Sequence, residues 1–152
     1  MKKLTLVIVA LLLAGASEAI AGPYGRGRGG WGAGGVYARM FDANTIETVI
    51  GDVVKINKIK PMRGMSYGVE LVLKTEKETL SIHLGPGWFI DNQDTKIAVK
   101  DHLEVKGSRV TIDGKPALLA ATVKKGDAVL QLRDDAGFPM WAAWRGNPPA
   151  TK

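Results

Sequence analysis

The amino-acid sequence predicts an all-β protein: a closed barrel of five to six short strands with one short helix. Three observations lead to this fold class. From about residue 46 onward, apolar and polar residues alternate in short runs, which is the period of a strand with one buried face. Turns containing glycine separate these runs. Residues 88–93 are the only plausible helical turn, and closing the sheet into a barrel hides the edges that it would otherwise expose.

The first 21 residues are expected to be a signal peptide and to lie outside the fold. Lys2 and Lys3 precede an apolar run from Leu4 to Ala14, and Ala19-Ile20-Ala21 has the pattern of a cleavage site. The apolar run is shorter than the roughly 20 residues that a membrane-spanning helix needs. We therefore expect a periplasmic or secreted protein, cleaved after Ala21 and without a membrane span afterwards. An uncleaved membrane anchor is the alternative.

Residues 22–44 are expected to form a flexible Gly/Arg-rich segment that leads into the barrel. Residues 22–35 contain eight glycines and no apolar period, and the backbone entropy of glycine opposes ordering. Two GxGxxG matches occur here, but a dinucleotide site needs a strand before the motif and a helix after it. Contacts of Arg26, Arg28 and Trp31 with nucleic acid, membrane or polymer are a weaker alternative to a plain spacer.

The barrel itself is expected to span residues 45–135. Its first strand alternates on one face up to Val53, and the phase changes at Val54, as in a bulged and strongly bent strand. Residues 69–73 and 80–84 then form a hairpin with one buried face.

The second half of the barrel follows the helical turn. Gly85-Pro86-Gly87 ends the strand before it, and the strand pattern resumes at Leu103. Gly107-Ser108 interrupts this next strand. Asp113-Gly114 and Gly126-Asp127 are turn signals that separate the remaining strands.

A helix between the third and fourth strands is typical of the oligonucleotide/oligosaccharide-binding (OB) barrel, in which five strands follow a Greek-key order. The chain resembles the small exported bacterial OB-fold proteins of the periplasmic BOF type over about residues 45–135. The segments that carry the resemblance are Thr48–Val53, His83–Trp88, Leu103–Ser108 and Leu130–Arg133. The resemblance implies an OB-type barrel that serves as a periplasmic binding or stress-related module and not as a catalyst.

An OB barrel binds its ligands on the outer face of strands two and three and on the neighbouring loops. The expected ligand-binding residues are Tyr67, His83, Trp88 and Arg133, with Lys58, Lys60 and Arg63 on the adjoining loop to attract an anionic ligand. Closing the end of the barrel is an equally good interpretation of Trp88, and it is the favoured one for Phe89.

Residues 136–152 are expected to form an aromatic C-terminal extension. Three aromatic residues and a methionine lie within residues 138–144. The favoured interpretation is that this segment packs back on the barrel, because an exposed apolar patch is a liability in an exported monomer. The alternative is that Trp141 and Trp144 bind a protein partner, with Trp144 the more exposed of the two.

The composition excludes several chemistries. The chain has no cysteine, so disulfides, thiolate metal sites and covalently attached haem are excluded. Its two histidines, His83 and His102, lack the spacing of a zinc site, and Met62-x-x-Met65 is only a weak candidate for Cu(I). No residue has an evident activating partner for nucleophilic catalysis. We expect no enzyme activity, no cofactor and no metal site.

The function expected from the sequence is non-catalytic binding in the periplasm or cell envelope, of an anionic ligand or an unknown envelope protein. One alternative is single-stranded DNA binding, for which the net charge of +6 and the basic loops argue. It is not favoured, because only His83 on the expected face can stack on a base. The other alternative is a structural partner in an envelope complex.

Overall fold

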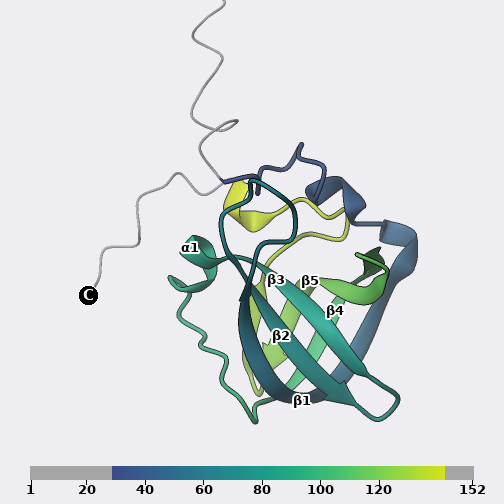
Figure 1. Cartoon of the computed structure of the whole chain (residues 1–152). Coiled ribbons are helices and arrows are strands. Elements are labelled where there is room, and N and C mark those ends of the chain that lie inside the picture. Colours follow the sequence, from purple (N-terminus) through teal and green to yellow (C-terminus); the bar gives the residue numbers. More distant parts are fainter. Residues whose placement is uncertain (1–28, 143–152) are drawn as a thin grey trace, which may run out of the picture.

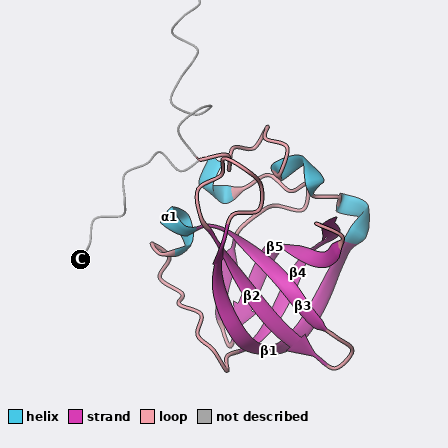
Figure 2. Ribbon diagram, in the orientation of Figure 1, coloured by secondary structure: helices cyan, strands magenta, loops and turns pink. Residues whose placement is uncertain are grey.

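The computed structural model describes residues 29–142 of the chain (Figure 1). Among these residues, five of six strands wind into a ring, the sixth pairs with one of them, and one short α-helix lies beside the ring (Figure 2). The predicted all-β barrel with one short helix is therefore confirmed. Residues 1–28, with the expected signal peptide, and Trp144 lie outside the described residues. Within the described range, no helix is both long and apolar enough to cross a membrane.

The strands follow one another along the chain with short connections, and the helix separates the third from the fourth. Their bounds are β1 (Ile46–Ile59), β2 (Gly68–Thr75), β3 (Thr79–Pro86), α1 (Gly87–Ile90), β4 (His102–Ile112), β5 (Lys115–Lys125) and β6 (Ala128–Gln131). Three single 3₁₀ turns lie outside the barrel, at Ala38–Met40, Ala43–Thr45 and Met140–Ala142.

The ring closes through one parallel pairing. β1 pairs antiparallel with β2 on one side and with β4 on the other, and β4 pairs with β5. Ser81–His83 of β3 then pair in parallel with Ala117–Leu119 of β5. The ring thus runs β1-β2-β3-β5-β4 and back to β1, and β6 adds to the remaining part of β5.

The predicted irregularities and turns are present. The register of β1 against β2 shifts between Val53 and Lys55, where the apolar alternation changes face. The register of β4 against β5 shifts between Lys106 and Gly107. Asp113 and Gly114 have φ values of 51° and 76°, as the tight turn between β4 and β5 requires.

The core of the barrel consists of branched aliphatic side chains from every strand. Leu71, Ile82, Leu103 and Leu118 are completely buried. Phe89 of α1 is 6% exposed and packs against Trp141 with ring centroids 5.5 Å apart. Phe89 therefore closes an end of the barrel, as expected from the sequence.

The expectation of a flexible segment over residues 22–44 is wrong from Gly29 onward. Trp31 and Tyr37 are 1% and 2% exposed and belong to the core. Their rings meet edge to face at 5.0 Å, and Trp31 Nε1 donates a hydrogen bond to the carbonyl oxygen of Ser66. Burying two large aromatic rings offsets the entropy cost of ordering the glycines. Gly29 and Gly30 have φ values of 59° and 85°, which other residues rarely adopt.

Trp141, expected as a partner-binding residue, is instead buried at 2% exposure. Its Nε1 donates to the carbonyl oxygen of Trp31 at 2.8 Å, and the Arg133 guanidinium lies 4.8 Å from its ring centroid. This part of the C-terminal segment therefore packs on the barrel, which was the favoured interpretation. Figure 1 shows the first and last described residues side by side at this end of the molecule.

We expect Trp31→Ala to lower the free energy of unfolding by about 3–5 kcal/mol, because it removes a fully buried aromatic ring. Urea unfolding followed by far-UV circular dichroism measures the effect. Val36→Ala is the control, since Val36 is 61% exposed in the same segment and its truncation should stay within about 0.5 kcal/mol. Equal effects of the two substitutions would mean that the segment does not pack on the barrel.

Candidate ligand-binding groove

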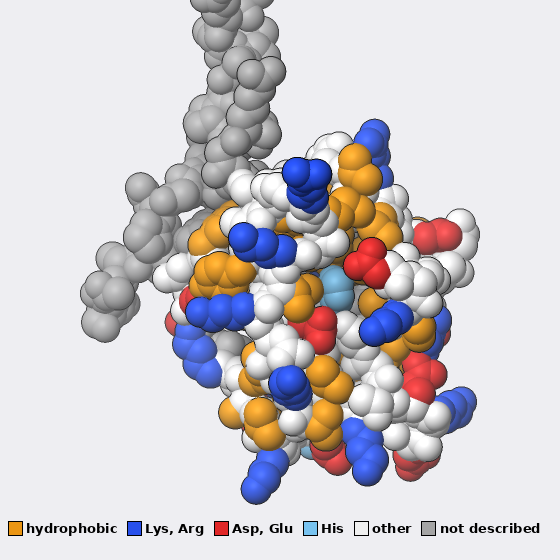
Figure 3. Space-filling model, viewed as in Figure 1, with side chains coloured by type: hydrophobic (Ala, Val, Ile, Leu, Met, Phe, Trp, Pro, Cys, Tyr) orange, Lys and Arg blue, Asp and Glu red, His pale blue; other side chains and the backbone are white. Residues whose placement is uncertain are grey.

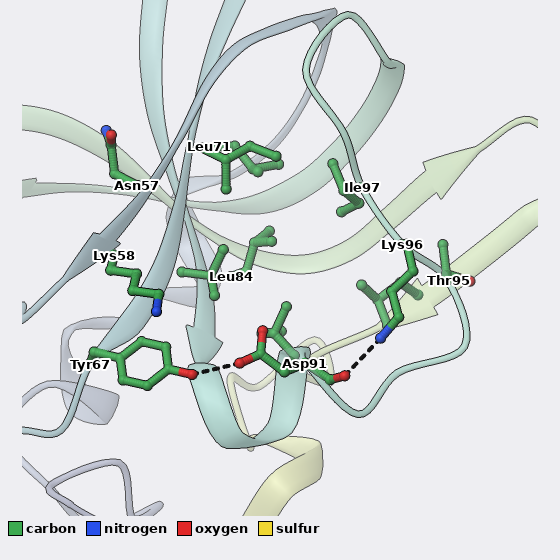
Figure 4. Close-up of a pocket in the computed structure, with 13 residues that line it drawn as sticks. Asn57, Lys58, Tyr67, Leu71, Leu84, Asp91, Thr95, Lys96 and Ile97 are labelled. Atoms are coloured by element: carbon green, nitrogen blue, oxygen red, sulfur yellow. Dashed lines mark hydrogen bonds between the residues drawn. The ribbon is translucent and has the colours of Figure 1, made fainter. Parts of the chain in front are cut away.

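A cavity of about 320 Å³ lies beside α1, a size within the range of small-ligand pockets (Figure 4). We call it the α1 groove. Its floor is apolar and consists of Ile56, Val69, Leu71, Leu84, Ile90, Ile97 and Leu130. Its rim is polar and consists of Asn57, Lys58, Tyr67, Asp91, Thr95 and Lys96. The groove therefore brings together side chains of β1, β2, β3, β6, α1 and the loop that follows α1.

The path of β1 creates this groove. β1 and β4 stay paired up to Asp52, opposite His102, and β1 then bends at its bulge. The loop after α1 is hydrogen-bonded to β1 at Val53. The Val53 N–H donates to the carbonyl oxygen of Asp101, and the Val53 carbonyl oxygen accepts from the backbone N–H of Lys100. Beyond Val53 the strand and the loop separate, and the space between them is the α1 groove.

The rim of the α1 groove carries two lysines and one carboxylate. The Tyr67 hydroxyl donates to the Asp91 carboxylate at 2.5 Å, and this hydrogen bond raises the pKa of Tyr67. The Lys58 ammonium lies 4.9 Å from the centroid of the Tyr67 ring, and the Lys96 ammonium donates to the Asp91 carbonyl oxygen at 2.7 Å. Figure 4 shows these groups around the apolar floor. Two ammonium groups against one carboxylate make the rim cationic on balance.

The residues predicted to form one ligand groove are divided among several places. Lys58 and Tyr67 line the α1 groove. Lys60 and His83 line a second groove of about 330 Å³ on the outer face of β2 and β3, the face that the OB resemblance predicts for ligands. The second groove is completed by the β1–β2 loop and the β4–β5 turn.

Neither Arg63 nor Trp88 contributes to the lining of these two grooves. Arg63 is exposed on the β1–β2 loop. Trp88 is half-buried on α1 and meets Phe89 edge to face, with ring centroids 6.4 Å apart.

His83 and Arg133 are buried and do not form the open contact surface that the sequence predicted. His83 is 5% exposed, and its Nδ1 shares a hydrogen bond with the Tyr37 hydroxyl at 2.9 Å. Arg133 is 2% exposed and donates from Nη1 to the carbonyl oxygens of Leu84 and Ala120, at 3.1 and 2.5 Å. Strand alternation places His83 on the outer face, but Tyr37 from the N-terminal segment covers it there.

Burial also shifts the pKa values of His83, Tyr37 and Arg133. It lowers the pKa of His83 from 6.5 to about 4, against the opposing effect of the Glu70 carboxylate, whose Oε2 is 4.0 Å from His83 Nε2. The Arg133 charge lowers the His83 pKa further. Burial raises the pKa of Tyr37 and lowers that of Arg133. His83 is therefore a neutral hydrogen-bonding residue at neutral pH.

The sequence did not identify several residues of the α1 groove. Asp91 is the C-cap residue of α1, and its carboxylate accepts from Tyr67 across the groove rim. Lys96 lies in a loop without any periodic pattern, so nothing in the sequence indicates its position beside Asp91. The exposure of Ile56 was not predicted either: the change of phase made Val54 and Ile56 the next apolar positions of the buried face, and they are 45% and 37% exposed.

A family model matches residues 45–130 of the chain, from the start of β1 into β6. This is more than half of the 152 residues. The chain belongs to the MamS/MamX magnetosome protein family. No curated protein matches the chain.

Membership of the MamS/MamX family supports the resemblance drawn from the sequence only in part. The matched residues are nearly those of the BOF-type resemblance, but the family that matches is a magnetosome protein family. All residues that line the α1 groove lie inside the matched range, whereas Trp31, Tyr37 and Trp141 lie outside it.

We expect the free energy of unfolding to fall by up to about 3 kcal/mol between pH 7 and pH 4 through His83 alone. Its pKa is about 4 in the folded protein and 6.5 in the unfolded chain, so the unfolded state binds more protons in this window and gains stability as the pH falls. Urea unfolding at several pH values measures the slope.

His83→Gln removes the titrating group and should flatten this part of the pH dependence. Val36→Ala is the control, because it removes no titratable group from an exposed position and should keep the wild-type slope. A slope that is the same in His83→Gln and the wild-type protein would contradict the burial of a neutral His83.

Proposed function

We propose that this member of the MamS/MamX magnetosome protein family is a non-catalytic binding module that holds its ligand in the α1 groove. One observation carries the proposal: a cavity with an apolar floor and a cationic rim, built from separate elements of the barrel. Such a groove is complementary to a ligand with an apolar body and an acidic group. The apolar floor supplies affinity, and Lys58 and Lys96 orient the acidic group.

The chemistry of the rim supports binding and not catalysis. Tyr67 and Asp91 are hydrogen-bonded to each other, and the pKa of Tyr67 is raised away from neutral pH by this contact. A general acid or base works best when its pKa is near the operating pH. The pair is therefore a fixed structural element that positions the Tyr67 ring beneath Lys58.

The compartment and the fold class complete the proposal. The signal-peptide pattern of residues 1–21 supports export, so the module acts in the periplasm or at the envelope. The ring of strands, with its helix between β3 and β4, supports an OB-type barrel that presents binding grooves between its strands and loops.

The two alternatives derived from the sequence have less support than binding in the α1 groove. Single-stranded DNA binding was suggested by the basic loops, but the one ring on the expected face that could stack on a base, that of His83, is 5% exposed and bonded to Tyr37. Beside it, Glu70 adds a negative charge to the second groove, which phosphate groups would avoid. The envelope-complex alternative relied on Trp141 and Trp144; Trp141 packs inside the protein, and Trp144 lies outside the described residues.

A defined test uses 8-anilinonaphthalene-1-sulfonate, a fluorescent probe with an apolar body and one anionic group. We expect it to bind, and we expect Lys58→Glu with Lys96→Glu to weaken the affinity roughly tenfold, because both rim charges then repel the sulfonate. Fluorescence titration at low and physiological salt gives the affinities. N-phenyl-1-naphthylamine, which lacks the sulfonate, should respond little to the two substitutions.

Lys115→Glu is the matched control, because it reverses an exposed charge in the second groove. It should leave binding of the anionic probe unchanged. If Lys115→Glu weakens binding as much as the double variant, or the double variant has no effect, the α1 groove is not the binding site. Tight binding of fluorescent single-stranded DNA at physiological salt would favour the nucleic-acid alternative.

A further inference from the structure

β1 has an unpaired edge along the α1 groove. Its pairing with β4 ends at Asp52, and backbone hydrogen bonds to the loop after α1 end at Val53. Its pairing with β2 continues to Ile59. Among the described strands, residues 54–59 therefore have a neighbour on one side only, and the other side faces the groove.

A second strand edge borders the same groove. β6 pairs with β5 alone among the described strands, and Leu130 of β6 contributes to the groove floor. Ile56, Asn57 and Lys58 of β1 line the opposite part. The α1 groove is thus a gap in the barrel wall between strand edges, with the core residues Leu71 and Leu84 at its base (Figure 4).

The side chains along the β1 edge include exposed hydrophobic residues, so they do not fully protect this edge. Val54 and Ile56 are 45% and 37% exposed. Figure 3 shows hydrophobic side chains gathered over the part of the barrel where β1 lies, with lysine and arginine among them. Natural proteins usually cover such an edge or keep it short, because it pairs readily with another strand.

The charges on β1 decide what kind of strand can pair there. Lys55 and Lys58 lie in the same six-residue stretch as Val54 and Ile56, and Lys96 faces it across the groove. A second copy pairing edge to edge would bring lysines against lysines, which is unfavourable. An acidic segment meets the opposite charge on both sides of the groove.

From these contacts we infer that the ligand of the α1 groove is an extended apolar and acidic peptide segment of a partner protein, which adds a strand to the free edge of β1. This inference rests on the proposed function and names the class of its ligand. The peptide backbone pairs with residues 54–59, about 20 Å of strand. An apolar side chain reaches the accessible part of the floor at Ile56, Val69 and Ile97, and acidic side chains meet Lys58 and Lys96.

Strand addition differs from the binding of a small amphipathic anion in a measurable way. Both ligands use the apolar floor and the lysines. Only a peptide pairs with the N–H and C=O groups of the β1 edge, and a small anion leaves those groups hydrogen-bonded to water. Amide hydrogen exchange at residues 54–59 therefore separates the two.

The test uses the synthetic peptide acetyl-Thr-Val-Glu-Val-Thr-Val-Glu-amide and the full chain. We expect binding that slows amide exchange at alternate residues of 54–59 by at least about tenfold, as hydrogen bonding to a new strand requires. The same peptide with alternate backbone nitrogens methylated should bind at least about tenfold more weakly. A peptide with lysine in place of glutamate should also bind at least about tenfold more weakly.

Two variants of the protein complete the experiment. Ile56→Glu introduces a negative charge into the groove beside the free edge and should abolish binding of the acidic peptide. Ile50→Glu is the matched control: Ile50 is 53% exposed on the same strand, in the part that pairs with β4, and should leave binding intact. Circular dichroism and thermal unfolding verify that both variants fold.

The outcomes distinguish this inference from the proposed function. Protection confined to the β1 edge and sensitivity to backbone methylation support strand addition. Equal binding of the methylated peptide, or no peptide binding while the anionic naphthalene probe still binds in the α1 groove, overturns strand addition and leaves the proposed function standing. If neither the peptide nor the anionic naphthalene probe binds, both strand addition and the proposed function are overturned. Slower exchange at residues 54–59 that depends on protein concentration without peptide would identify a second copy as the occupant and overturn the inference.

Discussion

The bulge between Val53 and Lys55 is the constraint on which the rest of this structure depends. An extra residue on one strand increases the local twist and turns the strand away from its neighbour. β1 can therefore pair with β4 in its first half and mainly with β2 in its second half. Gly51 permits the approach just before the bend, because a Cβ there would collide with the carbonyl oxygen of Lys74. The closed ring and the gap in its wall both follow from this one irregularity.

The sequence predicted those features that depend on neighbouring residues. The alternation of strands, the change of face at Val54 and the Asp113-Gly114 turn each have a local pattern, and each is present. No local pattern predicts the burial of Trp31, because its hydrogen-bonding partner Trp141 is 110 positions away. Lys58 and Tyr67 were identified by residue type, whereas Asp91 and Lys96 reach the groove only through the path of the loop after α1.

The α1 groove and the second groove have different relations to the rest of the chain. In the second groove, on the face where an OB barrel holds its ligands, His83 is covered by Tyr37 from the N-terminal segment. The α1 groove keeps an apolar floor that its polar rim leaves accessible. The residues that line the α1 groove belong to the part that matches the MamS/MamX family, and Tyr37 does not. Binding in this protein is therefore best sought beside α1.

The hydrogen bond between Trp141 and Trp31 also sets an order of assembly. Ribosomes synthesise Trp31 long before Trp141, so the hydrogen bond between them forms only after most of the chain has been made. Contacts between distant positions form late, since the loop between them must close first. The Gly-rich segment that leaves first is thus fixed last, after the strands and the final aromatic turn have formed. The barrel would exist for a time with His83 uncovered on its outer face, before Tyr37 reaches it.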